Sequence, residues 1–184
     1  MSRRIEAAGP PADYGDFYRR ELPAMVALAA AVTGSTIAAE DIAQDALVRA
    51  YRRWDQLASY DKPGAWVRRV TINLALSTRK RAATELKARL RLGAEPALSP
   101  APVDHDDIWT AVRRLPGQQR AAIALHYLED RPVAEIAEIL DCAENTAKVH
   151  LHRGRQALAE LLGPERRTEP APTDPPPTDN GAER

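Results

Sequence analysis

Apolar residues recur at helical spacing through the first part of this chain. The pattern predicts a helix over Phe17–Val32, which Pro23 interrupts early, and a second helix that Ser35 or Thr36 caps. The second helix reads AAEDIAQDALVRAYRRW, and at about 100° per residue its small and apolar side chains share one face. That face is the predicted core side, and it holds Ala43, Ala46, Leu47, Ala50 and Trp54.

A third helix follows a turn at Asp61–Gly64, where proline and glycine both disfavour helix. The helix opens at Trp66 and reads WVRRVTINLALSTRKR. A core role is favoured for Trp66 over stacking on an unpaired base, because this residue lies in the apolar stripe. The apolar stripe holds Trp66, Val67, Val70 and Leu74, one polar stripe holds Arg69, Asn73 and Lys80, and another holds Arg68 and Arg79.

The second half of the chain carries a helix-turn-helix pattern. Two short helices, Asp107–Leu115 and Gly117–Leu128, are separated by Pro116. Two more helices flank a three-residue turn, Asp141–Ala143. The apolar face before the turn holds Val133, Ile136, Ala137 and Leu140, and the face after it holds Ala147, Leu151, Leu158 and Leu162.

Composition favours an all-α protein of two small helical domains joined by a flexible linker. The chain has 184 residues, 44% of them hydrophobic and only 5% aromatic, and Ala, Leu, Arg and Glu are abundant. One cysteine excludes a disulfide framework, and no stretch reads as a signal peptide or membrane span, so a cytoplasmic location without membrane insertion is expected. The expected divisions are a flexible N-terminus (1–15), a first domain (16–91), a linker (92–104), a second domain (105–162) and a disordered proline-rich tail (163–184).

The charges are balanced overall but unevenly distributed. Twenty-six basic and 26 acidic residues give a net charge of zero, yet the segment Trp66–Arg91 holds eight bases against one acid. The sign reverses over Leu92–Asp130, where six acids face three bases. Such asymmetry indicates a local contact with a polyanion, although a solvated helix face is an alternative interpretation.

Three helix faces carry residue types that suit binding. On the second helix Val48 lies exposed among the charges of Asp41, Asp45 and Arg52, as in a protein-docking surface, although Asp45 also forms an ordinary i,i+4 pair with Arg49. On the third helix an amide flanked by cations suits contact with base edges and phosphates. The outward side of the last helix holds Asn145, Thr146, Lys148, Val149, His152 and Arg153. These residue types favour DNA reading over the alternative, an αα-hairpin with a solvated polar face.

Catalytic and metal sites are not expected. His150 and His152 point apart because they lie two positions apart on a helix, and Cys142 reads as a small packing residue in the turn. The acidic positions near Asp41 and Asp104 are explained by helix starts. No phosphate loop or nucleophile motif occurs, so neither an enzyme nor a cofactor is predicted.

The order of these modules resembles the extracytoplasmic-function sigma factors, the small two-domain members of the bacterial sigma-70 family. AEDIAQDALVRAYRRW resembles the region 2 helix that docks on RNA polymerase, and WVRRVTINLALSTRKR resembles the helix that recognises and melts the −10 promoter element. The run LPGQQRAAIALHYLEDRPVAEIAEILDCAENTAKVHLHRGRQAL resembles region 4, which reads the −35 element. The resemblance implies transcription initiation by non-covalent promoter binding, with flipped bases captured near Ser59–Gly64.

The resemblance also implies partners and roles for these faces. Core RNA polymerase and promoter DNA are the expected partners, and many relatives are held by an anti-sigma factor, although no residue here identifies one. Asn73 is the strongest candidate for direct base contact. The implied polymerase-docking residues are Asp41, Gln44, Asp45, Val48 and Arg52; the −10 residues are Trp66, Arg68, Arg69, Asn73, Arg79 and Lys80; the −35 residues are Asn145, Thr146, Lys148, Val149, His152 and Arg153.

Two rival interpretations stay open on the sequence. A helix-turn-helix regulator that binds operators without recruiting polymerase would bind DNA alone and would leave the face from Asp41 to Arg52 without a role. A helical scaffold or anti-regulator would bind no specific DNA sequence even with polymerase present.

Overall fold

A computed structural model describes residues 13–91 and 107–163 of the protein, and these residues form helices without strands. The first four helices are α1 (Tyr14–Thr33), α2 (Thr36–Tyr51), α3 (Trp54–Leu57) and α4 (Pro63–Arg91). The next four are α5 (Asp107–Arg114), α6 (Gly117–Glu129), α7 (Val133–Leu140) and α8 (Glu144–Leu162). The all-α prediction is confirmed.

Local sequence signals set several helix ends. The Asp13 side chain accepts a hydrogen bond from the Gly15 amide at 2.9 Å and starts α1. Gly34, at φ 82°, ends α1 in the left-handed conformation that glycine adopts without a steric cost. The Ser35 hydroxyl accepts from the Ala38 amide at 3.3 Å and starts α2, as predicted.

The expected interruption at Pro23 is wrong, because α1 runs through this residue as one helix. A proline inside a helix removes one backbone hydrogen bond. Burial of Phe17, Met25 and Leu28 along α1 holds the helix together on both sides of that position. Tertiary packing therefore outweighs the local signal.

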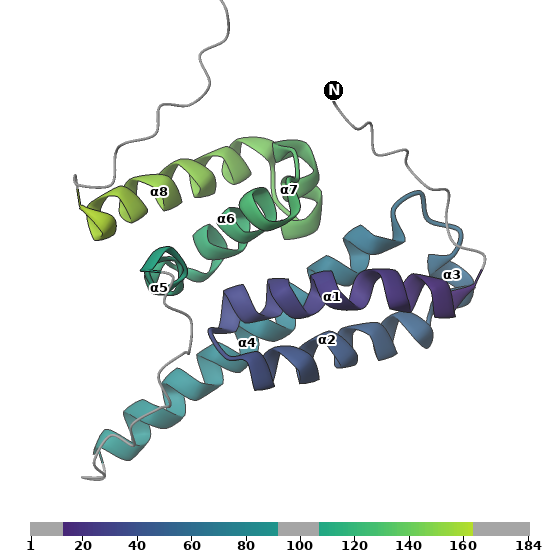
Figure 1. Ribbon diagram of the computed structural model, residues 1–184, viewed down its shortest axis with the longest axis horizontal. Helices are drawn as coiled ribbons and strands as arrows, with labels where there is room; N and C mark the ends of the chain where they lie inside the picture. The colour runs from purple at the N-terminus through teal and green to yellow at the C-terminus, as the bar shows by residue number, and fades with distance from the viewer. Residues whose placement is uncertain (1–12, 92–106, 164–184) are drawn as a thin grey trace, which may run out of the picture.

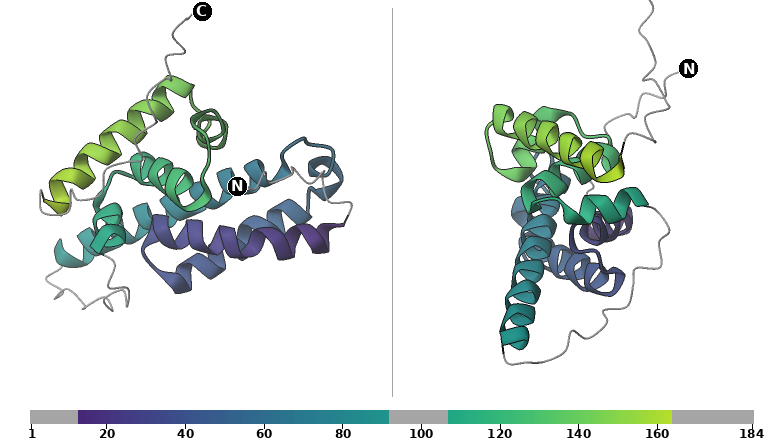
Figure 2. Two further views of the ribbon diagram at one scale, coloured as in Figure 1. Left: turned by 45° about the horizontal axis from the view of Figure 1, so that its top comes forward. Right: turned by 90° about the vertical axis from the view of Figure 1, so that its left-hand side faces the viewer.

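The first half of the chain, α1–α4, and the second half, α5–α8, pack against each other (Figures 1 and 2). Helices α5–α8 lie over α1 and α4, and the last turns of α4 project away from the body. One hydrophobic core holds α1, α2 and α4 residues together with residues of α5–α8, for example Val32, Ile72, Val112 and Leu125. A second core lies within the first half, around Phe17, Leu47 and Val67 among others.

Three predicted segments lie wholly or mostly outside the residues that the structure describes. The linker 92–104 lies outside the described residues, as do 1–12 of the N-terminus and 164–184 of the tail. Helix α1 already begins at Tyr14, inside the segment expected to be flexible. No described helix combines the length and hydrophobicity needed to cross a membrane.

Candidate nucleic-acid interface

Helix α8 presents one continuous polar face to solvent. All six residues predicted to read DNA on this helix are exposed, and Val149 keeps 44% of its surface. Ala147 and Leu151 point the opposite way and are buried in the core. The Lys148 ammonium pairs with the Glu144 carboxylate at 2.7 Å on the same exposed side. The arrangement suits insertion into a DNA groove, because the side of α8 that packs in the core is opposite to the side that carries the six predicted residues.

Helix packing and a tight turn fix the position of α8. Helix α7 ends at Asp141, at φ 57°, and the Cys142 amide then donates to the Ala137 carbonyl at 3.1 Å. Gly154 lies so close to α6 that an added Cβ would lie 2.8 Å from the Ile123 Cγ1 atom. The predicted helix-turn-helix is therefore present and closely packed.

Helix α4 separates the predicted −10 residues into exposed and enclosed sets. Asn73 and Lys80 are exposed. Trp66 is half-buried against the core of the first half, in agreement with its place in the apolar stripe, and the Arg53 guanidinium lies over its ring at 6.0 Å from the centroid. Arg79 is half-buried and donates to the Arg113 carbonyl at 2.9 Å, and burial lowers its pKa.

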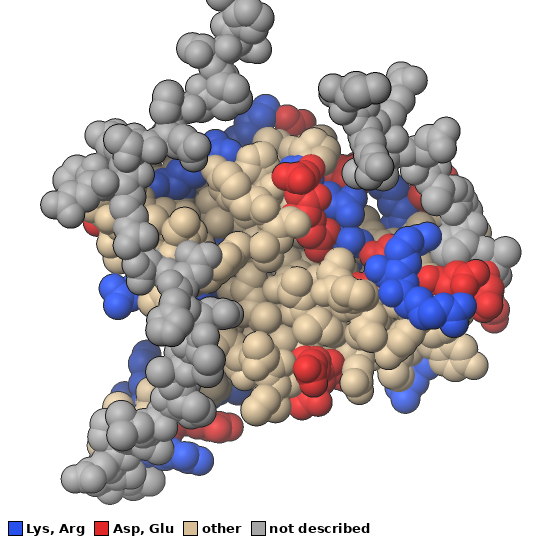
Figure 3. All heavy atoms as spheres, in the orientation of Figure 1, with Lys and Arg blue, Asp and Glu red and all other residues tan. Residues whose placement is uncertain are grey.

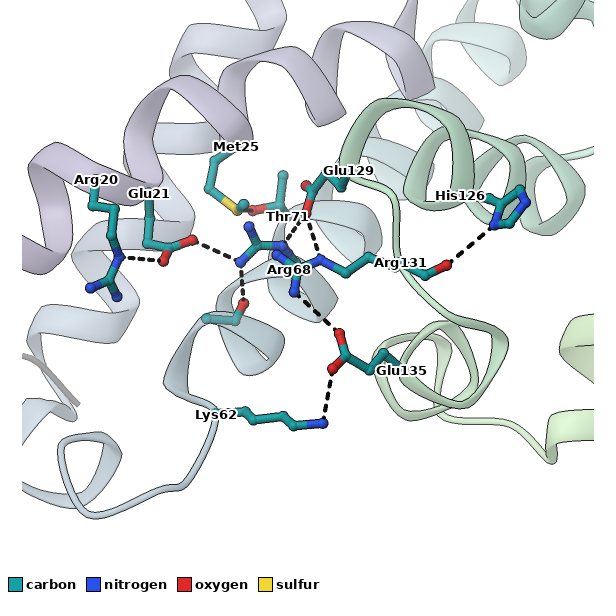
Figure 4. Close-up of polar contacts among 11 residues, drawn as sticks. Arg20, Glu21, Met25, Lys62, Arg68, Thr71, His126, Glu129, Arg131 and Glu135 are labelled. Atoms are coloured by element: carbon teal, nitrogen blue, oxygen red, sulfur yellow. Dashed lines mark hydrogen bonds and ion pairs between the residues drawn. The ribbon is translucent and has the colours of Figure 1, made fainter. Parts of the chain in front are cut away.

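Arg68 departs from the outward orientation that its polar stripe predicted. It is 5% exposed, between α1 and the end of α6 (Figure 4). It donates to Glu21 at 2.7 Å, to the Gly64 carbonyl at 3.1 Å, and to Glu129. Burial alone would lower the pKa of Arg68, but the charges of Glu129 and Glu21 outweigh burial and raise it. In this arrangement Arg68 holds helices together and does not reach solvent.

Arg69 lies at the edge of a cleft between the two halves. It pairs with the Asp141 carboxylate at 3.3 Å and donates to the Glu138 carbonyl. The cleft has a volume of about 410 Å³ and is bounded by the turn before α4, by α4 itself and by α7. Its lining residues are Tyr60, Asp61, Lys62, Ala65, Trp66, Arg69 and Glu138.

The predicted docking face on α2 is exposed along its length. Asp41, Gln44, Asp45, Val48 and Arg52 all face solvent. Val48 keeps 45% of its surface, and the Asp45–Arg49 pair is long, at 3.4 Å. Ile37 was not predicted for this face, yet it is 79% exposed four positions before Asp41 on the same stripe. The i,i+4 spacing was the signal that could have identified it.

Charged side chains on the face shown in Figure 3 lie beside partners of opposite sign near the start of α1. There the Arg19 guanidinium meets the Asp16 carboxylate at 2.5 Å. Uncharged residues cover the centre of this view. Charges of both signs are therefore mixed around the start of α1.

Comparisons with known proteins match both halves of the chain. The family models for sigma-70 region 2 and sigma-70 region 4 match residues 17–85 and 105–158. The ECF RNA polymerase sigma factor SigW of Bacillus subtilis is 30% identical over 167 residues, which cover 82% of this chain and 88% of SigW. SigM of Mycobacterium tuberculosis is 30% identical over 162 residues, with 85% and 80% covered. The sigma factor RpoE of Bartonella quintana, solved in complex with the anti-sigma factor NepR, has a similar structure, with a TM-score of 0.68 and 28% sequence identity. The match covers 85% of this chain and 100% of the RpoE chain.

Proposed function

Because the chain belongs to the extracytoplasmic-function sigma factors of the sigma-70 family, we propose that it directs core RNA polymerase to promoters through three separate helix faces. Helix α2 docks on the polymerase, α4 binds the −10 element, and α8 reads the −35 element. The protein works in the bacterial cytoplasm, with the polymerase. A further partner is expected from the class of anti-sigma factors, since the structural relative RpoE was captured with one.

The observation that carries this proposal is the exposed face of α2. A DNA-binding regulator that acted alone would have no use for an apolar Val48 and Ile37 among carboxylates. Burial of such side chains against a partner protein stabilises the complex by about 25 cal/mol for each Å² of apolar area removed from water. The charged neighbours Asp41, Asp45 and Arg52 favour a partner surface whose charges complement both signs.

The DNA contacts divide between base reading and phosphate binding. On α8 the amide of Asn145 can meet a base edge, and Val149 can meet a thymine methyl group. On α4 the exposed Asn73 amide lies on the same helix as the cation of Lys80, which neutralises phosphate. Trp66 and the turn before it line the cleft, which has room for an unstacked base.

Binding to core polymerase tests the role of α2 directly. We expect Val48→Asp to weaken binding by about tenfold or more, because the partner must bury a charge where it buried a methyl group. Leu161→Asp is the matched control, since Leu161 is 43% exposed and lies at the far end of α8. Titration of labelled core polymerase with each full-length variant gives the two affinities. Equal weakening by both substitutions, or by neither, contradicts the proposed docking face.

A further inference from the structure

Arg155 lies on α8 beyond the six residues predicted to read DNA, and a tyrosine of α6 holds its side chain. The Arg155 Nε atom donates a hydrogen bond to the Tyr127 hydroxyl at 3.0 Å, and the guanidinium carbon lies 5.7 Å from the centroid of the Tyr127 ring. Arg155 is exposed, and Tyr127 keeps 55% of its surface. The pair therefore joins α6 to α8 on the outside of the molecule.

Close packing of α6 against α8 brings these two side chains together (Figure 1). The helices meet where Gly154 lies against Ile123. Tyr127 follows Ile123 by about one helical turn, and Arg155 follows Gly154 directly, so the helix contact sets the positions of both. The guanidinium is thus held at a defined place on the surface.

The positive charge of Arg155 is not neutralised within the part of the chain that the structure describes. No carboxylate of residues 13–91 or 107–163 forms an ion pair with it. Lys148 lies two turns earlier on the same side of α8 and differs in this respect, because its ammonium pairs with Glu144 at 2.7 Å. A phenol is neutral, so the Tyr127 hydroxyl orients the guanidinium and leaves its charge available to an anion.

The length of α8 places this cation at the edge of a DNA groove. A recognition helix contacts base edges with its N-terminal residues. Arg155 follows Asn145 by ten positions, which is about 15 Å along the helix, whereas the major groove is about 12 Å wide. A cation at that distance lies past the base edges, where the sugar-phosphate backbone runs.

We propose that Arg155, positioned by Tyr127, binds a backbone phosphate at the rim of the groove that α8 enters. The Nε atom is used in the bond to Tyr127, and the two terminal nitrogens donate to the phosphate oxygens. Such a contact carries no sequence information, but it fixes the orientation of α8 on the duplex. This inference rests on the proposed function for the placement of α8 in DNA, but the contact itself can be measured without polymerase.

Binding of the full chain to a short random-sequence duplex tests the phosphate contact, because such a contact does not depend on sequence. Fluorescence anisotropy over a series of salt concentrations gives the affinity and the slope of log K against log salt. We expect Arg155→Gln to weaken binding about tenfold at low salt and to reduce the slope by about 0.9, the contribution of one phosphate. Arg114→Gln is the matched control, since it removes the same charge from an exposed arginine at the end of α5.

Tyr127→Phe tests the positioning role, because the ring stays and only the hydroxyl is lost. We expect about threefold weaker binding, and no further loss when this change is added to Arg155→Gln, because the hydroxyl acts through the arginine. Tyr51→Phe removes an exposed hydroxyl from α2 and should bind like the parent. Arg155→Lys should restore the slope without the full affinity, because an ammonium keeps the charge but lacks the planar fork. A purely structural role for the pair would leave the slope unchanged in all of these variants.

The outcomes separate the phosphate contact from the proposed function. Equal slopes and affinities for Arg155→Gln and Arg114→Gln would overturn the contact, as would a parent protein that does not bind the duplex. Additive losses from Tyr127→Phe and Arg155→Gln would overturn the positioning role of the tyrosine. If the Arg155 effect is present while the protein starts no transcription with polymerase, the proposed function falls and the contact stands. Transcription from defined promoters together with equal slopes overturns the contact alone.

Discussion

Arg120 carries a larger structural role than its sequence position suggests. It is 1% exposed and donates to three backbone carbonyls, those of Val32 at 2.5 Å, Leu115 at 2.5 Å and Val112 at 3.2 Å. These carbonyls lie at the ends of α1 and α5, where a helix leaves acceptors without partners and its dipole is negative. One guanidinium therefore caps two helices, and the bond to Val32 crosses between the halves.

The cost of removing this side chain follows from its contacts. Burial, with a smaller contribution from the charge of Arg79, lowers the pKa of Arg120 to about 10, so the group remains a cation at neutral pH. Each charge-assisted hydrogen bond contributes about 1.5–3 kcal/mol, so three contribute roughly 4.5–9 kcal/mol. Desolvation of the cation offsets several kcal/mol of this sum. We expect Arg120→Met to lower the free energy of unfolding by about 2–4 kcal/mol.

Urea denaturation followed by circular dichroism measures this loss. The control is Arg114→Met, which changes an exposed arginine at the end of α5 and should change the free energy of unfolding by less than about 0.5 kcal/mol. Arg120→Lys should fall between the two, because an ammonium keeps the charge but cannot reproduce the planar fork. An Arg120→Met protein as stable as the parent would refute the capping argument.

Three further predictions concern pH, packing and DNA. Burial raises the pKa of Glu135, but hydrogen bonds from Lys62 and Arg131 outweigh burial and lower the pKa. The stability that this carboxylate contributes is therefore present above pH 4.5 and is lost as the pH falls through the lowered pKa, so the urea midpoint between pH 6 and pH 3 should fall less for Glu135→Gln than for the parent. Gly154→Ala should destabilise the protein by about 1–3 kcal/mol in thermal melts, because the new methyl group meets Ile123. Lys148→Ala should reduce the slope of log K against log salt by about one for −35 duplex DNA.

Controls separate these effects from general damage. Gln156→Ala, an exposed change on the same helix as Gly154, should leave the melting temperature unchanged. For DNA binding, a slope that stays unchanged in Lys148→Ala would show that this ammonium meets no phosphate. For the pH series, equal acid sensitivity of the parent and Glu135→Gln would contradict the assigned ion pairs.

The sequence predicted the helices well because their signals are local. The recurrence of apolar residues at helical spacing predicted that Ala43 and Leu47 are buried and that Val48 is exposed, and the structure agrees at each of these positions. Capping residues located the start of α2, and the turn at Asp141 separated the two helices of the predicted motif. These features depend on neighbours within a few positions along the chain.

The positions that the sequence misplaced depend on distant partners. Arg68 reads as one more cation on a polar stripe, and only the fold brings Glu129 to it from 61 positions away. No local pattern in the sequence marks Arg120, whose bond to Val32 spans 88 positions. Helical periodicity holds no information about such contacts, so the closed packing of the two halves could not be predicted from it.

Run-off transcription with purified core RNA polymerase tests the central claim most directly. Fragments of bacterial genomic DNA serve as templates, with and without the full-length protein. The account predicts defined new start sites that disappear with Val48→Asp and persist with Leu161→Asp. Transcripts that are identical with and without the protein, on templates that it binds unaided, would contradict the account and favour an operator-binding regulator.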